Sequence, residues 1–250
     1  MKSKSNHTKS FMIYEELVEK IQNGTYQPNT KLPTEHEFMQ QYEVARGTIR
    51  EALQMLYQNG YIQKIQGKGS VVLDIRRKYN FPITELVSFK QIAKAMGGTS
   101  RTILQELSLI KPDAFIQTEL NVSTAAEIWK VVRTREIDGE KIILDVDYFN
   151  KQYITFLTKE ICEDSIYEYI ENELQLSIGF AKKEILVEEP TEMDRTYLDL
   201  EGFPNVVVVK NHVYLEDITL FQYTESRHRP DKFRFVDFAR RFANYSYPNM

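Results

Sequence analysis

The sequence predicts an α+β protein with two domains, a small one rich in helices followed by a larger one rich in strands. Its length of 250 residues is enough for two domains. Segments with helical periodicity precede Gly60, whereas β-branched runs separated by turn signals dominate after Ser100. The charge changes as well, because residues 1–78 carry 12 Lys and Arg against 8 Asp and Glu, and the others carry 20 against 28.

A basic first domain on an otherwise acidic chain is typical of a nucleic-acid-binding module joined to a part with another role. We expect residues 1–75 to form the first domain, 76–82 a linker, 83–241 the second domain and 242–250 a tail. The linker contains Arg76-Arg77-Lys78, which is either a solvated charge run or a segment that contacts a nucleic-acid backbone.

Three helices are expected in the first domain. The first runs from Phe11 to Asn23 and ends before Gly24. The second follows a capping box formed by Thr34 and Glu37 and runs to about residue 41. Residues 42–45 are a turn so short that the next element can only be a helix packed across the second one. The third helix therefore begins at Arg46. Its buried stripe is Ile49, Ala52, Leu53 and Leu56.

This arrangement is a helix-turn-helix over about residues 34–53. Arg46, Thr48 and Arg50 lie off the buried stripe, near the end from which recognition helices read base edges. The alternative for these arginines alone is a solvated basic face. A hairpin over about residues 61–73 favours the DNA-binding interpretation, since Gly67, Lys68 and Gly69 at its tip suit close approach to a phosphate.

Three motifs of this domain resemble the GntR family of bacterial transcription regulators: Leu32-Pro33-Thr34-Glu35, Arg46-Gly47-Thr48-Ile49-Arg50 and Gly67-Lys68-Gly69. The resemblance implies a winged helix-turn-helix whose DNA-binding residues are His36, Arg46, Thr48, Arg50, Gly67, Lys68 and Gly69. His36 replaces a usual arginine, Ala45 stands where serine is common, and Gly47 is a poor helix former.

The second domain is expected to be a sequence of strands with short helices between them. A loop and short helix over 86–96 come first, and the capping-box spacing of Thr124 and Glu127 predicts a further short helix. Asp138-Gly139 is a hairpin turn signal, and Ser165 begins the clearest helix. The expected strands cover residues 100–109, 128–135, 141–149, 178–188, 206–216 and a last hairpin of 220–226 with 233–238; further short helices are expected within 154–163 and 191–200.

Arg133 and Arg135 are two residues apart on a predicted strand, so both side chains lie on one face. Ser165 and Tyr167 occupy the first turn of a helix, which favours anions. If the two sets meet, they form a phosphate pocket. The more ordinary alternative is that the arginines form cross-strand ion pairs with carboxylates such as Asp145 or Asp147.

From Phe81 to about Arg241 the chain is similar to the effector domain of the HutC subfamily of GntR regulators. That resemblance implies a chorismate lyase-like (UTRA) α+β fold that often binds phosphorylated sugars. By the resemblance, Ser88, Arg133, Arg135, Ser165 and Tyr167 hold the phosphate, and Phe89, Asp145, Gln222 and His228 line the sugar side.

Within this subfamily, residues 157–162, 165–170 and 221–229 are most similar to regulators of trehalose operons in Gram-positive bacteria. This implies a repressor of trehalose uptake and utilisation genes with trehalose 6-phosphate as its effector ligand. Neutral Gln222 suits a hydroxyl-rich sugar without an ammonium group. Another phosphorylated sugar, such as glucosamine 6-phosphate, is the alternative effector.

The sequence also argues against other classes of protein. The hydrophobic share of 42% and the charged share of 27% are those of a globular protein, and no apolar run has transmembrane length, so we expect a cytoplasmic protein. The single Cys162 cannot form an internal disulfide, and the four histidines lack metal-ligand spacing. A lyase shares the effector fold, but no catalytic constellation is visible, so we expect no enzyme and no cofactor. The expected partners are double-stranded operator DNA, a sugar-phosphate effector and a second copy of the chain.

Overall fold

The computed structural model describes residues 8–74, 86, 89–91 and 99–235. These residues group into two compact units, 8–74 and 86–235, and each unit has hydrophobic clusters of its own. The predicted linker 76–82, the tail 242–250 and Ser88 lie outside the described residues, so the domain boundaries stay predictions. In the described residues no helix is long and apolar enough to cross a membrane.

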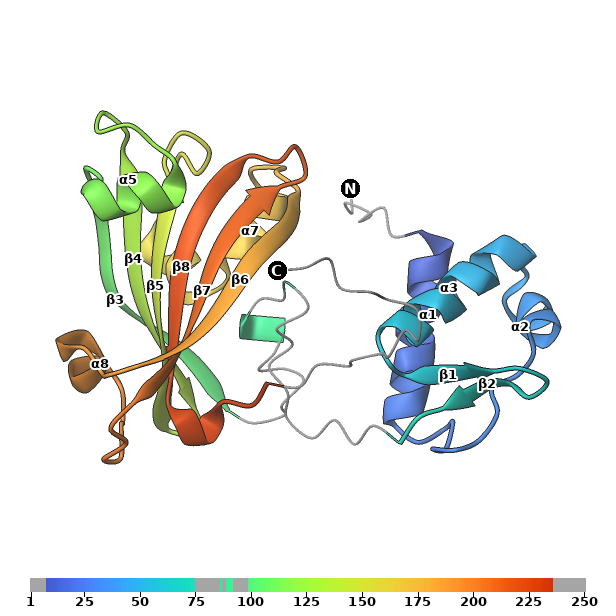
Figure 1. Ribbon diagram of the computed structural model, residues 1–250. Coiled ribbons are helices and arrows are strands. Elements are labelled where there is room, and N and C mark those ends of the chain that lie inside the picture. Colours follow the sequence, from blue (N-terminus) through green and yellow to red (C-terminus); the bar gives the residue numbers. More distant parts are fainter. Residues whose placement is uncertain (1–7, 75–85, 87–88, 92–98, 236–250) are drawn as a thin grey trace, which may run out of the picture. The chain divides into compact units, whose positions relative to one another are not determined.

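The first unit is a three-helix domain with a two-stranded hairpin (Figure 1). Its elements are α1 (Lys9–Gln22), α2 (Glu35–Tyr42), α3 (Arg46–Gln58), β1 (Ile62–Ile65) and β2 (Gly69–Val72). The three predicted helices and the wing are therefore confirmed. Helix α1 begins two residues earlier than predicted because the Thr8 side chain accepts a hydrogen bond from the Phe11 backbone N–H.

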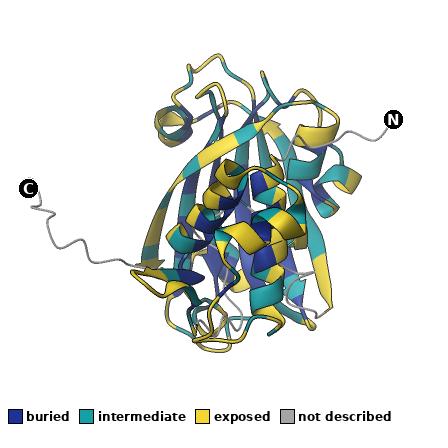
Figure 2. Cartoon of the chain, turned by 90° about the vertical axis from the view of Figure 1, so that its right-hand side faces the viewer, coloured by how far each residue is buried: buried dark blue, intermediate teal, exposed yellow. Residues whose placement is uncertain are grey.

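The core of this unit forms from the apolar stripes of its helices. Leu17 of α1 and Phe38 of α2 are buried, and so are all four residues of the predicted α3 stripe: Ile49, Ala52, Leu53 and Leu56. The Thr34–Glu37 capping box is present in both directions and fixes the start of α2. In Figure 2 the helix ribbons alternate between buried and exposed colours, as expected for helices that bury one face.

The second unit is built on a six-stranded antiparallel sheet with the strand order β3-β4-β5-β8-β7-β6. The strands are β3 (Ser100–Ile110), β4 (Ile128–Ile137), β5 (Glu140–Asn150), β6 (Ile178–Glu188), β7 (Val206–Leu215) and β8 (Leu220–His228). The helices are α5 (Ala114–Leu120), α6 (Lys159–Glu163), α7 (Ile166–Asn172), α8 (Glu192–Tyr197) and the 3₁₀ turn η1 (Pro230–Lys232). The predicted Asp138-Gly139 turn joins β4 to β5, with φ of 51° and 84° at its two residues.

Helices cover both faces of the sheet. On one face, α6 and α7 pack against Val131 of β4 and Phe149 of β5. On the other, α8 contributes to a cluster around Val132 and Val208, and α5 to a separate cluster with Tyr223. Since side chains alternate along a strand, Arg133 and Arg135 share the α7 face with Val131.

Two predicted elements of this unit are wrong. Residues 124–127 form no helix: residues 124–125 are a turn, and Ile128 already begins β4, which leaves no room for a helical nucleus. The helix in this region is α5, which the sequence pattern did not reveal although Asp113 caps it by accepting from the Ile116 N–H. Residues 233–235 also form no strand. Strand β8 pairs with β5 on one side and β7 on the other, so it has no edge left for a hairpin partner; residues 236–238 lie outside the described part.

Helix α7 is shorter than its sequence pattern indicates. Ser165 caps it by accepting from the Glu168 N–H, as predicted. The return bond of a capping box is not made, because the Glu168 carboxylate pairs with Lys90 at 3.0 Å. The helix ends at Asn172. Leu174, which lies beyond the helix, still packs against the apolar cluster that contains Val131 and Phe149.

Candidate functional site

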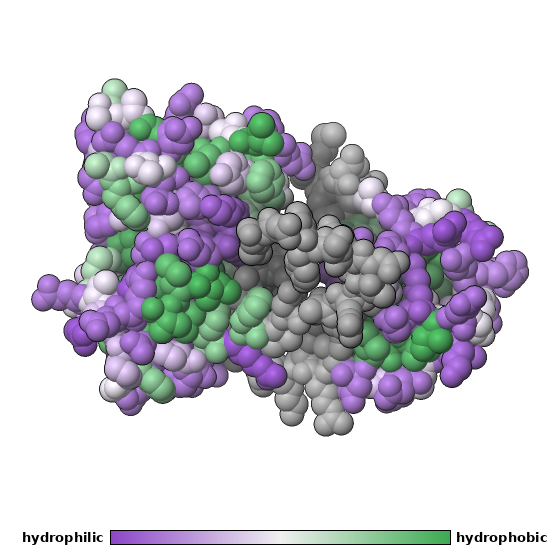
Figure 3. Space-filling model, in the orientation of Figure 1, coloured by the Kyte–Doolittle hydropathy of each residue, from purple (hydrophilic) through white to green (hydrophobic). Residues whose placement is uncertain are grey.

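The first candidate site is the exposed start of α3. The side chains of Arg46 and Arg50 are 71% and 69% exposed, and Thr48 is partly exposed beside them. The Glu35 carboxylate of α2 accepts from Arg46 Nε at 2.7 Å and lies 4.0 Å from Arg50 Nε. A guanidinium has five N–H donors, so this contact orients Arg46 and leaves most of its donors for other acceptors. The surface over α2 and α3 is predominantly hydrophilic in Figure 3.

Two further groups predicted to contact DNA are exposed in the same unit. His36 lies on the first turn of α2, where its ring nitrogen is 3.3 Å from the Gln40 amide. At the wing tip Gly67 and Gly69 have φ of 75° and 87°, and Lys68 stands exposed between them. Only glycine adopts such angles without strain, which explains the glycines at this turn. Glu35 was not among the predicted site residues, and the structure adds it as the partner of both arginines.

The second candidate site is a buried polar cluster on the α7 face of the sheet. Arg133 donates from Nη2 to Asp147 Oδ2 at 2.7 Å, and Arg135 donates from Nε to Asp145 Oδ2 at 2.8 Å. All four side chains are buried. In the register, Arg133 lies opposite Asp145, so each arginine reaches the carboxylate on the diagonal. The cross-strand ion pairs that the sequence left open are confirmed, whereas the phosphate pocket stays a prediction.

A chain of hydrogen bonds connects Arg133 to α7. The Gln222 amide donates to Asp147 Oδ1 at 2.9 Å, and the Tyr167 hydroxyl donates to Gln222 Oε1 at 3.0 Å. Arg133 Nη1 also donates to the Cys162 carbonyl at 3.3 Å, at the end of α6. The structure therefore brings the predicted residues Arg133, Tyr167 and Gln222 together around Asp147.

A second group of contacts surrounds Arg135. Its Nη1 donates to Thr102 Oγ1 at 2.7 Å, and its guanidinium lies 4.8 Å from the centre of the Phe89 ring. Its partner Asp145 also accepts from the Ser226 hydroxyl at 2.6 Å. Ser226 was not predicted, but it lies on the same face of β8 as Gln222 and His228, so strand alternation would have found it.

The electrostatics of the cluster follow from burial and mutual charge. Burial and the like charge of Arg133 lower the pKa of the Arg135 guanidinium. Burial opposes ionisation of Asp145, but the Arg135 and Arg133 charges outweigh it and hold the pKa of Asp145 below its ordinary value. Two arginines and two carboxylates balance in charge, yet Arg133 Nε has no hydrogen-bond partner among the described residues. Arg133 can therefore donate a further hydrogen bond to an acceptor from outside the cluster.

Two further predicted effector residues, Ser165 and His228, make contacts outside this cluster. The Ser165 hydroxyl is used in capping α7. His228 is buried with its ring 5.0 Å from that of Phe233, and burial lowers its pKa to about 4 although Asp145 opposes the shift. Burial raises the pKa of the Cys162 thiol to about 11, so this thiol is protonated at neutral pH.

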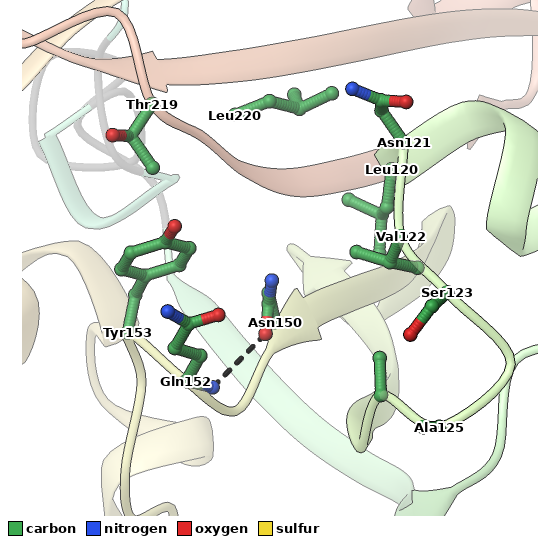
Figure 4. Close-up of a pocket in the computed structure, with 11 residues that line it drawn as sticks. Leu120, Asn121, Val122, Ser123, Ala125, Asn150, Gln152, Tyr153, Thr219 and Leu220 are labelled. Atoms are coloured by element: carbon green, nitrogen blue, oxygen red, sulfur yellow. Dashed lines mark hydrogen bonds between the residues drawn. The ribbon is translucent and has the colours of Figure 1, made fainter.

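A separate open pocket of about 580 Å³ lies where the α5–β4 loop, the end of β5 and the start of β8 meet (Figure 4). Asn121, Asn150 and Gln152 give it neutral polar walls, and the Gln152 backbone N–H donates to Asn150 Oδ1 at 3.0 Å. It contains none of the predicted effector residues. Within the described part of the chain, no three His, Cys, Asp or Glu side chains cluster in a way that could hold a metal ion.

Two protein-family descriptions match the chain. The description of the bacterial regulatory proteins of the gntR family matches residues 9–72, which contain the helix-turn-helix and the wing. That of the UTRA domain matches residues 95–234, which contain the six-stranded sheet. Both candidate sites fall within these two matches, apart from Phe89 and the predicted Ser88.

The chain is also similar to individual proteins. It is 54% identical to the HTH-type transcriptional regulator TreR of Bacillus subtilis (strain 168) over 233 residues, which cover 93% of this chain and 98% of the relative. It is 27% identical to the HTH-type transcriptional repressor NagR of the same organism, over 93% of this chain and 95% of the relative.

Two solved structures from Bacillus subtilis are similar to it. That of the possible transcriptional regulator YydK aligns with a TM-score of 0.78 and 27% identity, covering 94% of this chain and 100% of that one. The effector binding domain of the trehalose repressor TreR aligns with a TM-score of 0.53 and 57% identity, covering 57% of this chain and 99% of that one.

Proposed function

Because the chain belongs to the gntR family of bacterial regulatory proteins, we propose that it represses genes for trehalose uptake and utilisation and leaves its operator when it binds trehalose 6-phosphate. The family assignment makes it a DNA-binding transcriptional regulator and not an enzyme. The two candidate sites then take different roles. The exposed start of α3 and the wing contact DNA, and the buried arginine cluster of the UTRA domain binds the effector.

The observation that carries the effector proposal is the buried pair Arg133 and Arg135 on one sheet face. Guanidinium groups bind phosphate and carboxylate groups with two parallel hydrogen bonds, so two adjacent arginines suit a ligand that carries an anionic group of this kind. Arg133 Nε supplies a donor that no described residue uses. Ser165 and Tyr167, with Ser88 outside the described residues, complete the proposed phosphate site.

The sugar side of the site is proposed to consist of Phe89, Asp145, Gln222 and His228. Carboxylate and amide side chains accept and donate hydrogen bonds to sugar hydroxyls. The identity of 54% with TreR, whose effector binding domain is described as that of a trehalose repressor, supports trehalose as the sugar. Neutral Gln222 supports it too, because a sugar without an ammonium group needs no extra carboxylate.

DNA recognition is proposed to involve Arg46, Thr48 and Arg50 in the major groove, with His36 and the wing residues Gly67, Lys68 and Gly69 on the backbone. A homodimer would place two recognition helices on the half-sites of a near-palindromic operator. Effector binding then favours an arrangement in which the spacing of these helices no longer fits the operator.

The test is the melting temperature of the purified chain with trehalose 6-phosphate, trehalose, glucosamine 6-phosphate or inorganic phosphate. A ligand that binds only the folded state at about 100 times its dissociation constant adds about 2.7 kcal/mol, which is a clear shift. A large shift with trehalose 6-phosphate alone supports the proposal. A shift with another sugar phosphate alone rejects trehalose, and no shift with any of them rejects the effector site.

A further inference from the structure

A row of polar side chains leads away from the arginine cluster across the sheet. In the register, Asp147 of β5 lies opposite Thr224 of β8, and Thr224 lies opposite Asn211 of β7. Partners of this kind in an antiparallel sheet present their side chains on the same face. The row therefore begins at the carboxylate that binds Arg133 and continues over two further strands.

The row contains buried polar atoms without partners. Thr224 is 6% exposed and Asn211 is 9% exposed. Thr224 Oγ1, Asn211 Oδ1 and Arg133 Nε have no hydrogen-bond partner among the described residues, and Asn211 Nδ2 makes only a long bond of 3.4 Å to the Val209 carbonyl. Buried polar groups are nearly always hydrogen-bonded, and one that is not needs an explanation. Two of them in the row, and a third on the arginine that binds the first carboxylate of the row, indicate a shared ligand.

The chemistry of these atoms defines the ligand. A threonine hydroxyl both donates and accepts, and an amide oxygen accepts, so both suit hydroxyl groups and neither carries charge. The row runs about 10 Å from Asp147 to Asn211, given a strand spacing of about 4.8 Å. A ligand with its phosphate at the arginines would therefore reach Thr224 and Asn211 with a part that is rich in hydroxyls and lies beyond its first sugar ring.

We propose that Thr224 and Asn211 form a subsite for the hydroxyl groups of the second ring of a phosphorylated disaccharide. This inference rests on the proposed function, because it takes trehalose 6-phosphate as the ligand at the arginine cluster. The subsite selects a disaccharide phosphate over a monosaccharide phosphate, since a monosaccharide leaves both buried groups without partners.

The experiment compares Thr224→Val and Asn211→Leu with the unchanged full chain. Titration calorimetry measures the affinities for trehalose 6-phosphate and for glucose 6-phosphate, and thermal unfolding measures the stability of the free protein. Each variant should weaken trehalose 6-phosphate binding about tenfold, the loss of one hydrogen bond, and leave glucose 6-phosphate binding unchanged. The melting temperature without ligand should stay equal or rise, because each substitution removes a buried group that lacks a partner.

Thr134→Val is the matched control. Thr134 is a buried threonine whose hydroxyl has partners, accepting from Gln105 at 3.1 Å and contacting the Tyr197 carbonyl at 3.5 Å. It lies next to Arg133 in the strand and so on the opposite face of the sheet. This variant should lower the melting temperature without changing either affinity.

The outcomes separate the two proposals. If the unchanged chain binds trehalose 6-phosphate and both variants bind it equally well, the subsite is rejected and the proposed function stands. Equal losses of affinity for trehalose 6-phosphate and glucose 6-phosphate also reject the subsite, since the two residues would then not bind the second ring specifically. If the unchanged chain does not bind trehalose 6-phosphate, the proposed function and the subsite fail together.

Discussion

The ion pair of Arg133 and Asp147 shows how much a single residue of the buried cluster contributes to the stability of the fold. The two side chains are 7% and 3% exposed and 2.7 Å apart. Removing one partner of a buried pair leaves an uncompensated charge, which costs about 3–5 kcal/mol. Arg133→Ala should therefore lower the free energy of unfolding by about that amount in urea titrations. Under conditions where the variant is folded, it should bind operator DNA but no longer respond to the effector.

Arg101→Ala is the control for this prediction, since Arg101 is an exposed arginine on β3 of the same sheet. It should change neither stability nor effector response. An Arg133→Ala protein as stable as the unchanged chain would contradict the assignment of a buried, essential ion pair. Loss of operator binding at full folding would indicate a structural role that extends beyond the effector site.

Arg46 belongs to the exposed arginine pair at the start of α3. Arg46→Ala should weaken operator binding by about 1–3 kcal/mol and relax specificity at one base position if the side chain reads a base. Because its ion pair with Glu35 is exposed, the free energy of unfolding should change by less than about 1 kcal/mol. A gel shift with operator and mutated operators measures the effect, and an unchanged affinity would reject Arg46 as a DNA contact.

His228 makes stability depend on pH. Its pKa is about 4 in the folded chain because it is buried, whereas an unfolded histidine titrates near 6.5. The unfolded chain therefore binds the extra proton between these values, so stability is complete above about pH 6.5 and falls as the pH drops toward 4. Between pH 7 and pH 5 the loss attributable to His228 should be about 2 kcal/mol.

Urea unfolding at pH 7 and pH 5 measures this loss, with His228→Gln as the comparison. The variant should lose about 2 kcal/mol less than the unchanged chain over the same interval. The effect is separable from that of Asp145, whose lowered pKa makes its own contribution disappear only below the ordinary range of a carboxylate. Equal losses in the two proteins would show that His228 is not buried in the neutral form.

Helix α3 contains a glycine that its geometry does not require. Gly47 has no positive φ, and a Cβ built on it would meet nothing within 4 Å. Gly47→Ala should therefore stabilise the chain by about 0.5–1 kcal/mol through the higher helix propensity of alanine. Gly139→Ala is the contrasting variant, because φ at Gly139 is 84° in the β4–β5 turn, and it should destabilise the chain.

Thermal unfolding of the two glycine variants checks this difference in sign. A destabilised Gly47→Ala protein would mean that α3 needs the glycine for a reason other than backbone conformation. The Gly139 variant also bears on function, since the turn sets the register that places Arg133 opposite Asp145.

Elements whose signal lies within a few residues were predictable from the sequence. Elements in which a neighbouring strand overrides the local signal were not. The capping box of Thr34 and the Asp138-Gly139 turn act within a few residues, so their elements are confirmed. The Thr124–Glu127 spacing has the same local signal, but β4 begins at Ile128 and overrides it. In the same way, residues 233–235 follow a turn signal but find both edges of β8 occupied.

In the second unit as a whole, the sequence predicted that β4 and β5 are neighbours but not how the other strands are ordered. Alternation placed Arg133 and Arg135 on one face, but the order β4-β5-β8-β7 is a long-range choice of partners. It is this order that brings Gln222 to Asp147 and places Thr224 and Asn211 in the same row. Ser165 and Tyr167 could be placed at a helix start, but only the packing of α7 on that face brings Tyr167 to Gln222.

The two functions of the chain are thermodynamically coupled if the proposed mechanism holds. Binding linkage is reciprocal, so the factor by which trehalose 6-phosphate weakens operator affinity must equal the factor by which operator weakens trehalose 6-phosphate affinity. Calorimetric titration of the effector into free protein and into the protein–operator complex measures the second factor. Operator titrations with and without saturating effector measure the first. For a coupling of about 1–3 kcal/mol, typical of allosteric proteins, both should lie between about 5-fold and 150-fold. Effector affinity that is the same with and without operator would contradict release by allosteric coupling between the two sites.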